Sequence, residues 1–128
     1  MNEIVREWLA KSEDDWRVAR REFAADPDPS FDAACFHAQQ CIEKLMKAVL
    51  IDHQVLAPRT HDLLALSRLL ETLGTNWSWD EAELQDLHRA AVGYRYPGDS
   101  ADRQDAAQAL EVCERLRAAL HKLLSPEK

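Results

Sequence analysis

The segment VGYRYPGDS at residues 92–100 holds the side chains best suited to bind an anion. Arg95 stands between Tyr94 and Tyr96, which are the only two tyrosines of the chain. Two aromatic rings can hold a guanidinium by stacking and leave its forked N–H donors free for a phosphate or a carboxylate. We therefore predict that a ligand or a partner binds at Tyr94, Arg95, Tyr96 and Asp99.

The backbone needs of this segment explain only part of it. Pro97 and Gly98 form a turn dipeptide, and Ser100 is a good cap for a following helix. Neither role requires an arginine between two tyrosines. We keep two interpretations open at this point: a simple break between helices, or a functional loop.

A second group of candidate residues lies in the stretch HAQQCIEKLMK at 37–47. His37 and Cys41 are spaced i, i+4 on a helix and could offer two ligands to a metal. A structural site needs four ligands, and no second pair occurs at a matching spacing. We expect neither a metal nor a cofactor, and we keep His37 as a candidate contact residue.

The polar residues of the same stretch follow one another at steps of three or four. One interpretation is a solvated face with weak ion pairs, and we favour it. The other is a partly buried polar strip that pairs with another helix or subunit. In either case the candidate contact residues are Lys44 and Lys47, beside Gln40 and Glu43.

The tripeptide Thr60-His61-Asp62 opens the next apolar stretch. Thr60 is predicted to cap a helix, and Asp62 would complement its dipole. That leaves His61 available to bond back to the preceding helix, so we include it among the candidate contact residues.

Five helical stretches must position these side chains. Apolar spacing and capping residues predict helices over 2–23, 31–53, 61–73, 79–92 and from 100 or 101 onwards. The first should bury a face of Ile4, Val5, Trp8, Leu9, Ser12, Trp16, Ala19 and Phe23. The second should bury Ala34, Cys35, Ala38, Cys41, Ile42, Leu45, Met46, Val49 and Leu50. The last should bury Ala106, Leu110, Cys113, Leu116, Leu120 and Leu123. The pattern predicts an all-α, antiparallel, up-and-down bundle of four to five helices, in one domain over 1–128.

Composition narrows the class of protein. Three cysteines in helix interiors suit reduced, partly buried thiols. No apolar run is long enough to cross a bilayer, so we expect a cytoplasmic protein that does not bind membranes. The formal net charge is −7, which disfavours general attraction to nucleic acid. Any RNA or nucleotide would need a local cationic site.

Three segments taken together resemble the HEPN domain family. They are FHAQQCIEKLMKAVL (36–50), RTHDL (59–63) and YRYPGD (94–99), and the chain is similar in particular to the bacterial branch encoded beside minimal nucleotidyltransferases. The resemblance implies a helical bundle that commonly dimerises. It also implies a two-gene, toxin–antitoxin type system in which the HEPN chain is the toxin or an accessory subunit.

Many HEPN proteins are metal-independent ribonucleases that use an Arg followed, after four to six residues, by a His. This sequence departs from that pattern, because the positions after Arg95 hold Ser100, Ala101 and Asp102. Arg115 and His121 have the formal spacing but lie about 240° apart on one helix. Without the His, no neutral-pH base is present to activate a ribose hydroxyl.

We therefore predict a regulatory or nucleotide- and RNA-facing subunit that pairs with a small nucleotidyltransferase. A ribonuclease with an atypical site and a non-catalytic adaptor are the alternatives. The partner could attach a nucleotidyl group to Tyr94 or Tyr96. Ser78 is predicted to cap the fourth helix, in capping-box spacing with Glu81. We also predict a homodimer, on the reasoning that Trp77 and Trp79 bracket this cap and are not both buried in one small core.

Overall fold

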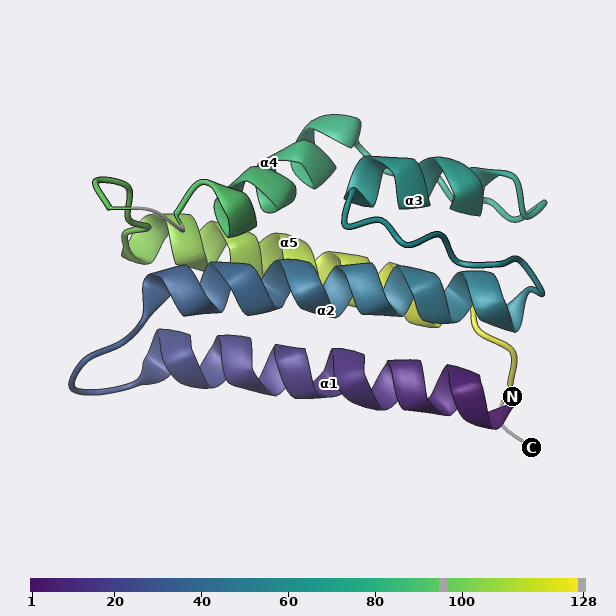
Figure 1. Cartoon of the computed structure of the whole chain (residues 1–128), viewed down its shortest axis with the longest axis horizontal. Helices are drawn as coiled ribbons and strands as arrows, with labels where there is room; N and C mark the ends of the chain where they lie inside the picture. Colours follow the sequence, from purple (N-terminus) through teal and green to yellow (C-terminus); the bar gives the residue numbers. More distant parts are fainter. Residues whose placement is uncertain (95–96, 127–128) are drawn as a thin grey trace.

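Five helices and no strand make up the part of the chain that the computed structural model describes, which is residues 1–94 and 97–126 (Figure 1). This confirms the predicted all-α class. No helix within these residues is long and apolar enough to cross a lipid bilayer. The elements are α1 (Glu3–Ala24), α2 (Phe31–Asp52), α3 (Leu63–Glu71), α4 (Glu81–Val92) and α5 (Arg103–His121).

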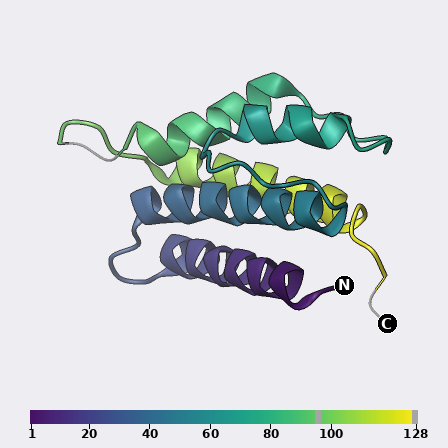
Figure 2. The same cartoon turned by 45° about the vertical axis from the view of Figure 1, so that its right-hand side comes forward.

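Helix α2 is the centre of the bundle. In Figure 1, α1 runs beside it in the opposite direction, α5 lies behind it, and α3 and α4 lie on the side away from α1. The turned view of Figure 2 shows the same layers. Because α2 is covered on several sides, all nine of its positions predicted to be buried are fully so: Ala34, Cys35, Ala38, Cys41, Ile42, Leu45, Met46, Val49 and Leu50.

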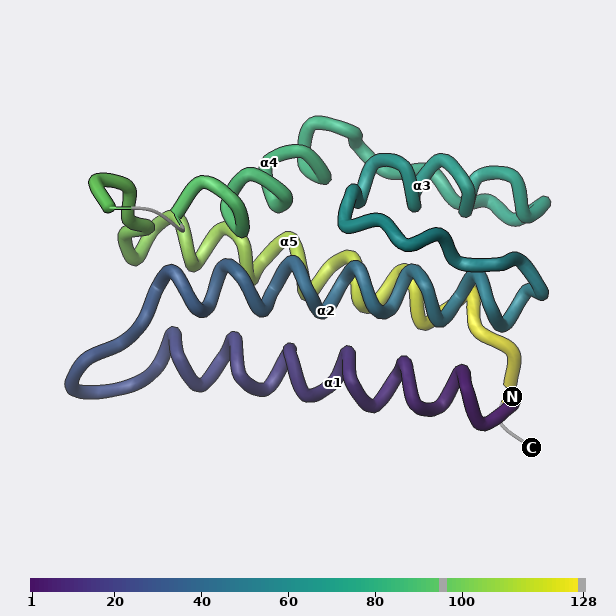
Figure 3. Tube along the Cα trace, viewed as in Figure 1, coloured from purple at the N-terminus to yellow at the C-terminus, as the bar shows by residue number. Residues whose placement is uncertain are grey.

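The two other long helices complete the core. In Figure 3, α1 and α2 lie side by side along their full lengths, and the start of α1 and the end of α5 lie at the same end of the bundle. Helix α1 buries Val5, Trp16 and Ala19, whereas Ile4, which was predicted on the same face, is 58% exposed. The Ser12 hydroxyl donates to the Cys41 carbonyl at 2.8 Å and so joins α1 to α2. All three cysteines are free thiols, and they are fully buried rather than partly buried as predicted.

The starts of two helices differ from the prediction. Thr60 was expected to cap the third helix, but Asp62 does so, because its carboxylate accepts from the backbone N–H groups of Leu64 and Ala65. The Thr60 hydroxyl instead accepts from the N–H of Asp62 at 3.1 Å. In the same way Asp80, not Ser78, caps α4. Each aspartate lies two residues beyond the predicted cap, and each offers a charged acceptor to the helix dipole.

Helix α5 also begins later than Ser100 or Ala101. Asp102 is its cap, and a capping box joins the Asp102 carboxylate to the Asp105 N–H at 2.8 Å and the Asp105 carboxylate to the Asp102 N–H at 2.9 Å. The Ala101 N–H donates to Asp32 at 2.7 Å, which holds the segment before α5 against the start of α2. The start of α5 is therefore fixed from two sides.

Trp77 and Trp79 do not form the exposed aromatic surface from which a dimer was predicted, although Trp79 is only partly buried. Trp77 is only 7% exposed, and its indole N–H donates to the buried Ser67 hydroxyl at 2.9 Å. Trp79 stacks on Trp77 with ring centroids 5.6 Å apart and donates to Glu83. The short segment between α3 and α4 folds both rings back onto the core, so they do not form an exposed aromatic surface.

Candidate functional site

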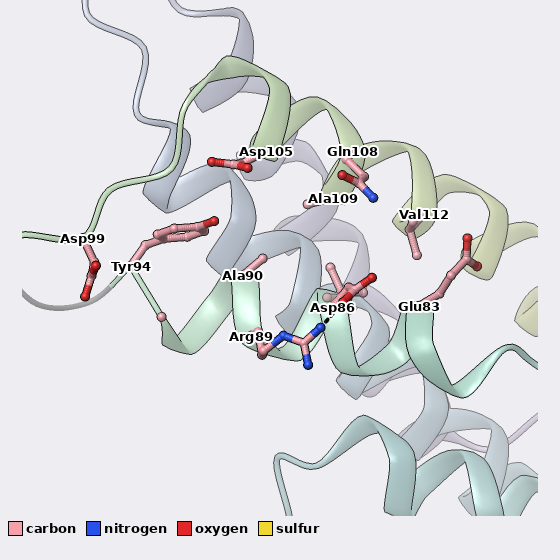
Figure 4. A pocket seen from close by; sticks show the side chains of 12 residues that line it. Glu83, Asp86, Arg89, Ala90, Tyr94, Asp99, Asp105, Gln108, Ala109 and Val112 are labelled. Carbon is pink, nitrogen blue, oxygen red and sulfur yellow. Dashed lines mark hydrogen bonds and ion pairs between the residues drawn. The ribbon is translucent and has the colours of Figure 1, made fainter.

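A groove of about 600 Å³ lies between α4 and α5, next to the segment that joins them (Figure 4). Helix α4 contributes one face, α5 contributes the opposite wall, and Tyr94 and Asp99 come from the connecting segment. Its floor is apolar and its rim is charged. The lining residues are Glu83, Asp86, Leu87, Arg89, Ala90, Gly93, Tyr94, Asp99, Asp105, Gln108, Ala109 and Val112.

The rim of this groove is acidic. Four carboxylates and one arginine line it, and that arginine, Arg89, already pairs with Asp86 on the same helix. Glu83 is held by Arg115 of α5, which lowers the pKa of its carboxyl. Asp99 is exposed and forms no ion pair with another described residue. A polyanionic strand would meet net negative charge here.

Tyr94 is the most distinctive side chain of the groove. Figure 4 shows its ring extending from the end of α4 towards the first turn of α5, where Asp105 lies. Burial raises the pKa of the Tyr94 phenol, and Asp105 raises it further through its charge and through hydrogen bonding. The hydroxyl therefore stays protonated at neutral pH, with a carboxylate beside it that can accept the proton.

The structure places two of the predicted loop residues in one site. Tyr94 and Asp99 both line the groove. Arg95 and Tyr96 lie outside the described residues, so their predicted roles rest on the sequence alone.

The predicted contact residues of α2 lie elsewhere and do not line the groove. Asp15 of α1 is nearly buried and pairs with two of these candidate residues, His37 and Lys44. His37 Nδ1 is 2.8 Å from one carboxylate oxygen, and Lys44 Nζ is 2.7 Å from the other. His37 is thus paired with Asp15, whereas the buried Cys41 thiol lies 3.4 Å from the Ser12 hydroxyl, so the two side chains have different partners. Within the described ranges, no three His, Cys, Asp or Glu residues are grouped to hold a metal ion.

Glu43 pairs with the remaining two candidate contact residues, Lys47 and His61. Its side chain is 4% exposed, and that of Lys47, whose Nζ lies 3.2 Å away, is 8% exposed. His61 bonds back to Glu43 with Nδ1 at 3.0 Å, as predicted. The favoured interpretation of a solvated face was therefore wrong, because Trp8 and the segment before α3 cover this strip. The alternative, a partly buried polar strip, is confirmed.

Several lining residues were not singled out from the sequence, namely Glu83, Asp86, Arg89, Asp105 and Gln108. Their spacing of three on two helices was visible, but charged residues at that spacing usually mark a solvated face. The sequence could not show that these two faces meet. The neighbouring His88 was also missed. It lines a smaller cavity of about 290 Å³ with Asp62 and Arg89, and its Nδ1 is buried with no hydrogen-bond partner among the described residues.

Comparison with known families decides the identity of this bundle. The model of the HEPN domain matches residues 5–123, which is nearly the whole chain. The chain belongs to the HEPN domain family. No curated protein matches it significantly.

Two solved structures share the HEPN fold seen here. The crystal structure of TT1696 from Thermus thermophilus has a TM-score of 0.75 and 24% identity, over 94% of this chain and 98% of that one. The crystal structure of ST0689, an archaeal HEPN homologue, has a TM-score of 0.67 and 22% identity, over 92% of this chain and 95% of that one. At these identities the likeness establishes the fold only.

The groove has a clear chemical consequence for a HEPN protein. No histidine is among its described lining residues, and the sequence has none four to six residues after Arg95. The described side chains can orient a hydroxyl, accept its proton and attract a cation.

Proposed function

We propose that this HEPN chain is a regulatory, partner-binding subunit that works in the cytoplasm with a small nucleotidyltransferase encoded beside it, in a toxin–antitoxin type pair. The observation that carries the proposal is the placement of Tyr94 beside Asp105 in a groove next to the segment that contains Arg95. This arrangement presents a hydroxyl acceptor to an incoming enzyme.

The acceptor chemistry follows from these groups. The Tyr94 oxygen attacks the α-phosphorus of a nucleoside triphosphate that the partner holds. A new O–P bond forms, the bond between the α-phosphorus and its bridging oxygen breaks, and pyrophosphate leaves. The phenol proton passes to Asp105. Because the pKa of this phenol is raised, the reaction depends on a base beside the hydroxyl, which Asp105 supplies.

The charge of the groove favours this role over RNA cleavage. The carboxylates of the groove outnumber its single arginine, which is already paired, so the groove itself attracts phosphates only weakly. A triphosphate bound by the partner brings its own counter-ions, and only its reacting phosphorus has to reach Tyr94. In this proposal Arg95, next in the chain, orients the phosphates through bidentate hydrogen bonds.

Co-expression with the neighbouring nucleotidyltransferase tests the proposal. The intact mass of the HEPN chain should rise by that of at least one nucleotidyl group. Tyr94→Phe should abolish the increase, and Tyr96→Phe is the matched control that removes the other tyrosine. Asp105→Asn should slow the modification while it keeps an acceptor for the Asp102 N–H in the capping box.

Two results would overturn this assignment. An adduct that persists when both tyrosines are replaced would place the modification elsewhere. If the neighbouring gene product neither modifies the chain nor co-purifies with it, the regulatory role itself is wrong. Cleavage of RNA by the purified chain, lost on Arg95→Ala, would support the atypical ribonuclease instead. If the chain is not modified, does not co-purify with the neighbouring gene product and does not cleave RNA, the structural adaptor is the remaining interpretation.

A further inference from the structure

His61 is mostly exposed to water, yet buried groups of α2 hold it in place. Its side chain is 80% exposed. Its Nδ1 lies 3.0 and 3.1 Å from the two carboxylate oxygens of Glu43, and its backbone carbonyl accepts from Gln39 Nε2 at 3.2 Å. Glu43 and Gln39 are both buried. The position and the orientation of this imidazole are therefore set by the core side of α2, although most of the ring faces solvent.

The hydrogen-bond network also determines which ring nitrogen is free. Glu43 pairs with Lys47 Nζ at 3.2 Å and acts as the acceptor for its neighbours. Nδ1 of His61 therefore carries the ring proton and donates to Glu43, which leaves the lone pair on Nε2. Nε2 forms no hydrogen bond with another residue of the described ranges. A carboxylate that holds one ring nitrogen in this way makes the other a stronger base and nucleophile.

The surroundings of His61 narrow what Nε2 can do. A metal site needs further ligands, and the described part of the chain has no group of three His, Cys, Asp or Glu residues that could hold an ion. A general base works on a substrate bound beside it, and His61 lines neither of the two cavities described above. An exposed and oriented nucleophile is best placed to accept a group that a donor molecule brings from outside.

We propose that His61 is a phosphoryl acceptor, and that its donor is a small molecule with an activated phosphoryl group, either an acyl phosphate or a phosphoramidate. The Nε2 lone pair attacks phosphorus, and a new N–P bond forms. The bond from phosphorus to the leaving group breaks, so an acyl phosphate releases a carboxylate and a phosphoramidate releases ammonia. The Nδ1 proton stays on the ring, where Glu43 stabilises the positive charge that the ring gains. No group is oxidised or reduced.

The charges around His61 suit an anionic donor better than those of the groove between α4 and α5. The charge of Glu43 is balanced by Lys47. Asp62 caps α3, and the opposite formal charge comes from Arg59, which is exposed and forms no ion pair with another described residue. The donor therefore meets no net negative charge here, whereas the rim of the groove is acidic. The proposal does not depend on the nucleotidyltransferase partner proposed above.

Labelling of the folded chain with phosphoramidate at neutral pH tests the proposal. Peptides are mapped under alkaline conditions, because acid cleaves the N–P bond to imidazole. Among the five histidines of the chain, we expect the adduct to form first at His61. Acetyl phosphate, as the second donor, should give the same order.

Exposure alone would also favour His61, so the reference is an imidazole that is exposed but not held. Leu56 lies in the same segment and is 91% exposed. Leu56→His places an imidazole there without the bond to Glu43. His61 should react about 10-fold or more faster than the imidazole at position 56, because only His61 is oriented by a carboxylate.

The double variant Glu43→Gln/Lys47→Met separates reactivity from a purely structural role. It removes both charges without stranding either, and a thermal melt checks that the chain is folded. The rate at His61 should fall to that of the imidazole at position 56. The proposal is overturned if the folded double variant reacts at the wild-type rate, since the bond to Glu43 then only fastens the segment before α3 to α2. It is also overturned if wild-type His61 reacts no faster than position 56, a comparison that needs no change at Glu43.

Discussion

Replacement of Lys47 by methionine tests whether the polar strip on α2 is a buried ion pair rather than a surface one. The Glu43 carboxylate is 4% exposed and receives donors from Lys47 at 3.2 Å, Gln39 at 3.3 Å and His61 at 3.0 Å. Methionine keeps the length of the lysine stem but removes the cation, and with it the contact of Nζ over the Trp8 ring. Glu43 is then a buried carboxylate without its lysine.

The expected cost follows from that geometry. Loss of one partner from a buried pair typically costs about 3–5 kcal/mol. The remaining donors to Glu43 offset part of this, so we expect a loss of about 2–3 kcal/mol in the free energy of unfolding. Lys44→Met is the matched control, because Lys44 is 24% exposed and its partner Asp15 keeps His37. That change should cost about 1 kcal/mol or less.

Urea unfolding at neutral pH measures both variants, with the double variant Glu43→Leu/Lys47→Met beside them. The double variant should recover most of the loss, because it removes the stranded charge. The reasoning is refuted if Lys47→Met is no more destabilising than Lys44→Met. It is also refuted if the double variant is less stable than Lys47→Met alone, since Glu43 would then contribute without its lysine.

Three further predictions concern a cap, a thiol and the loop. Asp62→Ala should lower the free energy of unfolding by about 1 kcal/mol in thermal melts, and Thr60→Ala by less, because Asp62 caps α3. Burial raises the pKa of the Cys35 thiol from 9.0 to about 12. The contribution of the protonated thiol to stability is therefore complete below pH 9.0 and is lost as pH rises towards 12. Cys35→Ala should consequently show a shallower decline of stability between these two pH values. Arg95→Ala should keep the stability measured in thermal melts within about ±0.5 kcal/mol of wild type. The same change should weaken partner or nucleotide binding several-fold in a titration, and Arg95→Lys should recover only part of that loss. A large drop in melting temperature with unchanged binding would make Arg95 a structural residue.

Local and periodic features of the sequence predicted the core well. Helix α2 is apolar at nearly every step of three or four, and it is buried where that spacing places it. Helix starts were less accurate, because Thr60 and Asp62 are both good caps two residues apart. Only the backbone path shows which of them reaches the free N–H groups.

Features that need two distant segments were not predictable in the same way. Glu43 and Lys47 have the spacing of a solvated pair. The sequence indicated that His61 could bond back to the preceding helix, but it did not show that this bond would go to Glu43 or that the pair would be buried. The acidic groove depends on the meeting of α4 and α5. The partnership of Tyr94 with Asp105 likewise exists only once the start of α5 is fixed by its capping box. The residue pattern of a single helix gives no information on distances between side chains of different helices.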